Sequence, residues 1–92
     1  MNAYDAYLGQ DYPYAPAVYV DGYYVGTAPV SLQVAEGREH IVTVDWTVYS
    51  SYWGWDVYVV DFSGNYNGYA NGNTVYFTPY YDTTINALYC WW

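Results

Sequence analysis

Turn-forming residues divide this chain into short segments, and their spacing limits the fold more than any other feature. The pairs Asp21-Gly22 and Glu36-Gly37 have the chemistry of tight turns, and residues 64–73, GNYNGYANGN, are saturated with Gly and Asn, which tolerate positive φ. Between these turns, apolar and polar residues alternate with the period of two that is typical of β-strands. The sequence therefore predicts short strands joined by turns.

We expect about seven strands and no helix, which makes the fold class all-β: a small antiparallel β-sandwich of the immunoglobulin-like type. A hairpin is expected from Ala17 to Val25 around Asp21-Gly22, and further strands at 30–34, 40–48, 57–62, 75–78 and 83–89. The 40–48 segment alternates most clearly, whereas 57–62 has apolar residues at both parities and predicts a strand buried on both faces. The expected core is Val18, Val20, Val30, Leu32, Val34, Val42, Val44, Phe62, Phe77 and Ile85.

Aromatic residues supply much of the apolar content of these strands. The 92 residues include sixteen Tyr and five Trp, and 54% of the chain is hydrophobic. Aromatic residues favour strands, and this apolar content suffices for one small core. We expect residues 17–92 to form a single β-sandwich domain. Residues 1–16 contain two prolines and no clean alternation, so we expect an N-terminal arm or linker there.

The charge of the chain excludes several classes of partner. Arg38 is the sole Lys or Arg residue, and the net charge is −8. Such a chain repels the phosphates of nucleic acids and of anionic lipids, so we expect neither as a partner. No stretch approaches the roughly 18 consecutive apolar residues of a membrane span, so we expect no membrane insertion by this segment.

Residues suited to catalysis or metal binding are sparse. The one histidine, His40, stands next to a predicted turn without a nearby nucleophile-and-base pattern. Asp56, Asp61 and Asp82 match no calcium-loop spacing, and Cys90 has no second cysteine with which to pair. We therefore expect a protein that is not an enzyme and that holds neither a metal nor a cofactor.

Aromatic side chains gather in two predicted loops and at the C-terminus. Flat rings in loops stack on sugar faces or bury a large area against a protein partner. The candidate binding residues are Tyr49, Tyr52, Trp53 and Trp55 in the loop 49–55, and Tyr66 and Tyr69 in the loop 64–73. Cys90, Trp91 and Trp92 are the candidate interface residues, because adjacent tryptophans after the last strand need a surface to pack on.

The segment from Val18 to Val44, VYVDGYYVGTAPVSLQVAEGREHIVTV, resembles the PEGA-type module. Its pattern is a strand ending in a V-D-G turn, then G-T-x-P, then an alternating strand, then an E-G turn into V-x-V. The ending from Asp82 to Tyr89, DTTINALY, is similar to the last strand of β-sandwich repeats in archaeal and bacterial surface proteins. PEGA modules usually place one residue between the turn Gly and a His or Tyr, whereas two residues precede His40 here, so we expect a bulge or a shifted register.

The resemblance implies an extracytoplasmic all-β accessory module, often repeated in long surface proteins, with no family-wide catalytic residues. We therefore expect a non-enzymatic extracellular or cell-surface module with a structural or adhesive role, which acts through aromatic-rich β surfaces. Its expected partners are further copies of itself or neighbouring domains of a surface protein. The alternative is a carbohydrate-binding module that stacks polysaccharide on the loop Trp and Tyr residues.

Overall fold

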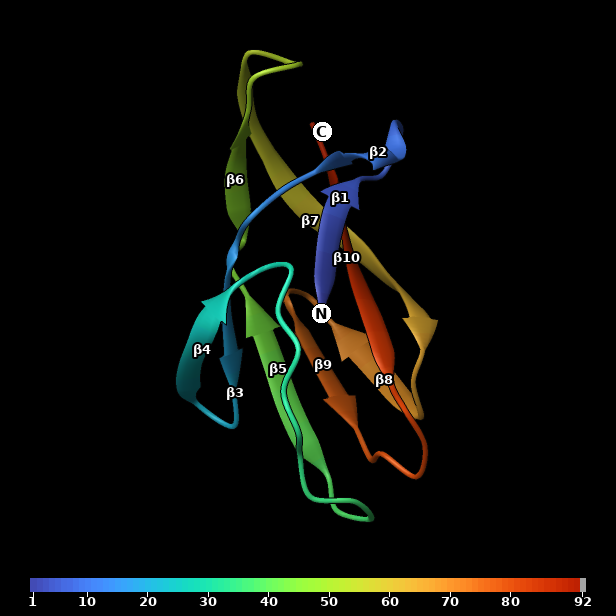
Figure 1. Cartoon of the computed structure of the whole chain (residues 1–92). Helices are drawn as coiled ribbons and strands as arrows, with labels where there is room; N and C mark the ends of the chain where they lie inside the picture. The colour runs from blue at the N-terminus through green and yellow to red at the C-terminus, as the bar shows by residue number, and fades with distance from the viewer. Residues whose placement is uncertain (92) are drawn as a thin grey trace.

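The chain forms a β-sandwich of two sheets (Figure 1). The structure is a computed structural model and describes residues 1–91. Its strands are β1 (Asn2–Asp5), β2 (Gly9–Pro13), β3 (Ala17–Val20), β4 (Tyr23–Thr27), β5 (His40–Val44), β6 (Thr47–Ser50), β7 (Trp55–Asn65), β8 (Gly68–Asn71), β9 (Thr74–Phe77) and β10 (Thr84–Cys90). No helix occurs in this part of the chain. The predicted all-β sandwich is confirmed, although with ten strands in place of about seven.

Each layer of the sandwich is a five-stranded sheet. Sheet A has the order β2-β1-β10-β7-β6, and sheet B has the order β4-β3-β5-β9-β8. Neighbouring strands are antiparallel except for β1 and β10, which run parallel with Asn2 beside Asn86 and Asp5 beside Tyr89. The first and last strands of the chain therefore lie side by side in the middle of sheet A.

Residues 1–16 belong to the sandwich and are not the arm or linker that we expected. They form β1 and β2, and the Tyr14 amide donates to the Ala3 carbonyl at 2.9 Å. The prolines that suggested a linker occupy positions where a missing amide is tolerated. Pro13 ends an edge strand, and Pro16 is buried where the chain crosses from sheet A to sheet B.

The hairpin at Asp21-Gly22 is confirmed. Both residues have positive φ, 53° at Asp21 and 86° at Gly22, as a tight two-residue turn between strands requires. After the next turn, β5 starts at His40 and pairs Val42 with Val20, so His40, Val42 and Val44 face the core. The extra residue before His40 is therefore accommodated in the turn, and the buried face of β5 is the expected one.

The segment 30–34 is not a strand, contrary to expectation. It lies within an irregular strap, residues 28–39, that crosses one side of the sandwich above a cleft of about 420 Å³. Val30 exchanges two backbone hydrogen bonds with Met1, of 2.7 and 3.0 Å, and Leu32, expected in the core, is exposed. The alternation keeps the strap extended, but the flanking strands β3 and β5 already have neighbours on both sides and leave it no position between them.

The strand expected over 40–48 is two strands. β5 ends at Val44 in sheet B, and β6 begins at Thr47 in sheet A, so the chain changes sheets at Asp45 and Trp46. The alternation runs through this crossing because each piece has its own inward face. Trp46, which the pattern placed beside Val42 and Val44, is consequently exposed.

The later strands also differ from the pattern. β7 buries only one face, because a bulge opposite Leu88 and Tyr89 inserts Val60 as an extra, exposed residue. The Gly/Asn-rich region expected as a loop contains β8, whose Gly68 packs against the backbone of β9: an added Cβ would lie 1.9 Å from the Tyr76 carbonyl oxygen. The loop at 49–55 is shorter than expected, so Tyr49 lies on β6.

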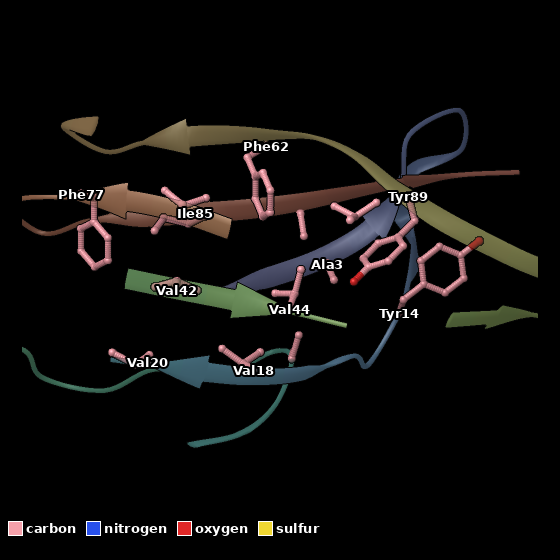
Figure 2. Packing of buried hydrophobic residues seen from close by; sticks show 14 of the residues in the cluster. Ala3, Tyr14, Val18, Val20, Val42, Val44, Phe62, Phe77, Ile85 and Tyr89 are labelled. Carbon is pink, nitrogen blue, oxygen red and sulfur yellow. The ribbon is translucent and has the colours of Figure 1, made fainter. Parts of the chain in front are cut away.

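The core lies between the two sheets (Figure 2). Among the expected core residues, Val30 and Val34 are only half-buried and Leu32 is exposed, while the others are buried. The buried residues of the core that lie outside the expected core set are Ala3, Tyr14, Ala28, Val57, Val59, Val75, Ala87 and Tyr89. Tyr14 and Tyr89 close one end of the core with ring centroids 5.8 Å apart (Figure 2).

Candidate functional site

Sheet A extends past sheet B at one end of the molecule. Sheet B stops near Ala17 and Asp45, where the Asp45 amide donates to the Ala17 carbonyl at 3.2 Å and the Tyr89 hydroxyl donates to the Asp45 carbonyl at 2.5 Å. The β6–β7 hairpin, the β1–β2 loop and the end of β10 lie beyond this level (Figure 1). Side chains there have no opposing sheet to pack on.

Five aromatic residues fill this space, and we call them the aromatic end: Tyr7, Tyr52, Trp53, Trp55 and Trp91. Trp53 is half-buried at the centre, with its ring centroid 6.1 Å from that of Tyr7, 4.8 Å from Tyr52 and 5.9 Å from Trp91. Trp55 packs on Trp91, and their ring centroids are 6.5 Å apart. The four outer rings are between 44% and 79% exposed, so the aromatic end is a continuous apolar surface open to solvent.

A buried carboxylate lies under the aromatic end. The Oδ1 atom of Asp5 accepts hydrogen bonds of 2.9 Å from the backbone amides of Tyr7 and Leu8, and its Oδ2 atom accepts hydrogen bonds of 2.7 Å from the Tyr14 hydroxyl and the Trp53 indole. Asp5 thus holds the β1–β2 loop and the central indole in place. Asp5 is fully buried, and these four hydrogen bonds offset the free-energy cost of removing its charged carboxylate from water.

The surroundings keep Asp5 ionised and Tyr14 neutral. Burial acts to raise the pKa of Asp5, but the hydrogen bonds from Tyr14, Trp53 and the two amides outweigh it, so the pKa lies below its ordinary value. Burial, together with the negative charge of Asp5, raises the pKa of the Tyr14 hydroxyl. The Tyr14 hydroxyl is also hydrogen-bonded to the Ser50 hydroxyl at 3.0 Å, which ties the segment after β2 to β6.

The structure brings part of the predicted aromatic set together. Tyr52, Trp53 and Trp55 meet at the aromatic end, and Tyr49 lies next to it on β6. The other loop is elsewhere: Tyr66 packs against the core, and Tyr69 of β8 stacks on Tyr76 of β9, with centroids 5.0 Å apart.

The C-terminal candidates have different positions. Trp91 joins the aromatic end, whereas Cys90 is a buried free thiol, which disfavours a bridge to another chain. Trp92 lies outside the described residues. Tyr7 was not predicted, because it falls in a segment whose sequence pattern gave no strand signal.

A groove adjoins the aromatic end between β2 and β6, the two edge strands of sheet A. Its volume is about 360 Å³, and Tyr12, Tyr49, Asp11 and Ser51 are among its lining residues. Sheet A curls strongly enough that its two edges meet here: the hydroxyls of Tyr12 and Ser51 are 2.6 Å apart. The groove therefore has aromatic walls with hydroxyl and carboxylate groups at its rim.

His40 is engaged elsewhere in the fold. It is buried, with Nδ1 at 2.7 Å from Asp21 Oδ2 and Nε2 at 2.7 Å from the Ala35 carbonyl oxygen. Both partners are acceptors, so the imidazolium form satisfies both contacts. The hydrogen bond to Asp21 outweighs the effect of burial and raises the pKa of His40. Because Asp21 Oδ1 also accepts from the Ile41 amide at 2.9 Å, this pair ties the β3–β4 turn to β5.

Within the described residues 1–91, no group of three or more His, Cys, Asp or Glu side chains is placed to hold a metal ion. The same part of the chain has no helix able to cross a membrane.

Comparison with known proteins identifies the family. Residues 12–61, just over half of the chain, match the family model of the PEGA domain, from β2 to the middle of β7. The chain matches no curated protein and no solved structure. The matched region includes the Asp21-Gly22 hairpin, the strap and the turn into β5, which are the segments that carried the resemblance in the sequence. The chain belongs to the PEGA domain family.

Proposed function

We propose that this PEGA domain is a non-enzymatic structural module of a cell-surface assembly that binds further copies of itself through the aromatic end. PEGA domains are typically extracellular or periplasmic, which supports a role outside the cytoplasm. The observation that carries the proposal is the exposed ring surface of Tyr7, Tyr52, Trp55 and Trp91 around Trp53. Exposed aromatic patches of this kind mark interaction sites, and Trp and Tyr supply much of the binding energy at interfaces.

The Asp5 network supports this role because it fixes the surface before any partner arrives. Asp5 anchors Trp53 by its indole and Tyr7 by its amide, so little side-chain or loop ordering remains to oppose binding. The aromatic end consists of Tyr and Trp side chains and offers no pair of opposite charges to a second copy, so the contact between copies depends on the apolar area that it buries. The net charge of −8 opposes the approach of two copies, so the contact should strengthen as salt concentration rises.

The size of the aromatic end sets the strength of the contact. The molecule measures 41 × 22 × 21 Å, so an end offers a cross-section of 22 × 21 Å, about 460 Å². Stable complexes bury about 800 Å² on each partner, so one such contact is weak. Weak contacts become effective when many copies are held on one surface, since linkage makes the later contacts intramolecular.

The edges of the two sheets are poorer candidates for assembly, because each is protected. β2 carries Asp11 and Pro13, β4 is interrupted by a bulge opposite Val18 and Tyr19, and β8 has only four residues. β6 is crossed by β2 where Tyr12 meets Ser51. Edge-to-edge pairing is therefore disfavoured relative to contact at the aromatic end.

A catalytic role has little support among the described residues. Both ring nitrogens of His40 are engaged, by Asp21 and by Ala35, so the one histidine offers no free base. Asp5 is fully buried and accepts four hydrogen bonds. We therefore include the absence of catalysis in the proposal, and a panel of glycoside and ester substrates tests it.

Size-exclusion chromatography with light scattering across a concentration series tests the self-association. We expect the mass of the wild type to rise with concentration and the Tyr7→Ala/Trp55→Ala double variant to remain monomeric. Tyr80→Ala is the matched control, because Tyr80 is 60% exposed and lies in the turn between β9 and β10 at the opposite end of the molecule (Figure 1). A wild type that stays monomeric at every concentration contradicts the proposal.

Polysaccharide binding is the second candidate function. The groove beside the aromatic end favours it, because exposed Tyr49 and Asp11 combine a stacking surface with a hydrogen-bond acceptor. Quenching of Trp fluorescence by polysaccharide, lost on Trp53→Ala or Trp55→Ala, would place that binding on the aromatic end itself.

A further inference from the structure

We propose that the groove between β2 and β6 binds a sugar unit of a neutral polysaccharide. This inference deepens the second candidate function and does not depend on self-association through the aromatic end. The groove has a volume of about 360 Å³, within the range of small-molecule sites, and it is a meeting point of two strands that lie at opposite edges of one sheet.

The walls of the groove are held in position by contacts within the fold. The Tyr12 hydroxyl is 2.6 Å from the Ser51 hydroxyl, and the Tyr12 ring packs edge-on against Tyr14 and Tyr52 with centroids 5.5 and 5.6 Å apart. Tyr14 is in turn fixed by Asp5 at 2.7 Å. A preformed site of this kind loses little conformational freedom when a ligand binds.

The side chains at the rim have the chemistry that recognises a sugar. The Tyr49 side chain is 65% exposed and offers a flat face on which a pyranose ring can stack. Asp56 lies directly opposite Tyr49 on β7, so both side chains are on the same face of sheet A. Asp11, which lines the groove, and Asp56, which lies beside Tyr49, are exposed carboxylates that can accept hydrogen bonds from sugar hydroxyls, and the hydroxyls of Tyr12 and Ser51 can donate or accept.

Charge selects the class of polysaccharide. Arg38 is the sole Lys or Arg residue, and it lies in the turn at the end of the strap, at the opposite end of the molecule from the groove (Figure 1). Across residues 1–91 the one ion pair is His40 with Asp21, so no cation neutralises Asp11 or Asp56. The groove therefore repels uronates, sulfates and phosphates, and neutral hexose polymers fit it.

Affinity electrophoresis of the full chain in native gels tests the site, since the net charge of −8 gives the protein good mobility. The gels contain hydroxyethylcellulose or dextran as neutral polysaccharides, or alginate as a polyuronate. We expect retardation by at least one neutral polymer and none by alginate. Tyr49→Ala and Asp11→Asn should each weaken the binding at least tenfold, a factor equivalent to about 1.4 kcal/mol.

Two control variants distinguish binding in the groove from binding elsewhere on the molecule. Tyr80→Ala controls for the loss of an exposed tyrosine and should bind like the wild type, as should Trp55→Ala, which alters the aromatic end but not the groove. Circular dichroism checks that each variant is folded. The proposal is overturned if neither neutral polymer retards the protein, if alginate retards it equally, or if folded Tyr49→Ala binds like the wild type. Light scattering judges self-association separately, so one proposal can fail while the other stands.

Discussion

Asp5→Asn is the substitution whose effect follows most directly from the structure. Asn keeps the shape of the side chain but replaces one acceptor oxygen with an NH2 group. In either orientation of the amide, two donors lose their acceptor: the Tyr14 hydroxyl and the Trp53 indole, or the two backbone amides of the β1–β2 loop. Each hydrogen bond to a charged group is worth about 1.5–3 kcal/mol.

Two effects reduce the total below the sum of these bonds. The variant no longer buries a charge, and the Tyr14 hydroxyl can turn toward Ser50, which is 3.0 Å away. We therefore expect a loss of about 3 kcal/mol in the free energy of unfolding. A domain of this size has a total stability of about 5–14 kcal/mol, and each kcal/mol shifts the unfolding midpoint by about 4–8 °C. The midpoint should consequently fall by about 12–24 °C.

Thermal unfolding followed by near-ultraviolet circular dichroism measures this shift. The matched control is Asp11→Asn, the same change at an exposed carboxylate of β2, which should alter stability by no more than about 0.5 kcal/mol. Fluorescence gives a second signal, because the Trp53 indole loses its charged acceptor. If Asp5→Asn unfolds within a few degrees of the wild type, the network does not organise this end of the molecule.

Three further predictions concern other parts of the sandwich. The stability that the His40–Asp21 pair contributes is fully present below the unfolded pKa of His40, 6.5, and is lost as pH rises through its raised folded pKa. Between mildly acidic and mildly alkaline pH, the unfolding midpoint should therefore fall more for the wild type than for Asp21→Asn. Parallel curves for the two proteins would contradict this. Tyr89→Phe removes a partly buried hydrogen bond and should cost about 1 kcal/mol in urea unfolding, and an unchanged midpoint would argue against that bond. Gly68→Ala puts a methyl group 1.9 Å from a β9 carbonyl oxygen and should destabilise the fold by more than about 3 kcal/mol. The control, Gly9→Ala, meets only open space at φ 76° and should cost about 1–2 kcal/mol. Equal unfolding midpoints for the two variants would refute the close packing of β8 on β9.

The alternation of apolar and polar residues predicts strands well where each strand stays in one sheet. The hairpin around Asp21-Gly22 is such a case, because its turn residues and its pattern agree. The pattern fails at Asp45, since a chain that crosses from one sheet to the other keeps alternating through the crossing. It also fails at 30–34, where an extended segment crosses the sandwich without joining either sheet. Local periodicity shows which face of a strand points inward, but it does not identify the strand with which it pairs.

Part of the aromatic end was predictable from the sequence. Tyr52, Trp53 and Trp55 are close in sequence, so their clustering was visible without the fold. Tyr7 and Asp5 join them because β1 pairs in parallel with β10, and this contact between opposite ends of the chain has no local signature. In the sequence, a buried carboxylate such as Asp5 cannot be distinguished from an exposed one.

The central claim is that copies of this domain bind each other through the aromatic end, and Trp indole signals in NMR spectra recorded across a dilution series test it most directly. The indole N–H signals of Trp55 and Trp91 should shift with concentration, because both rings are exposed at the aromatic end. Trp46 is an internal control, since it is also exposed but lies at the crossing between the sheets, against Gly72. Shifts confined to the aromatic end would support self-association through that surface. Signals that do not move, or that move equally at Trp46, would contradict it.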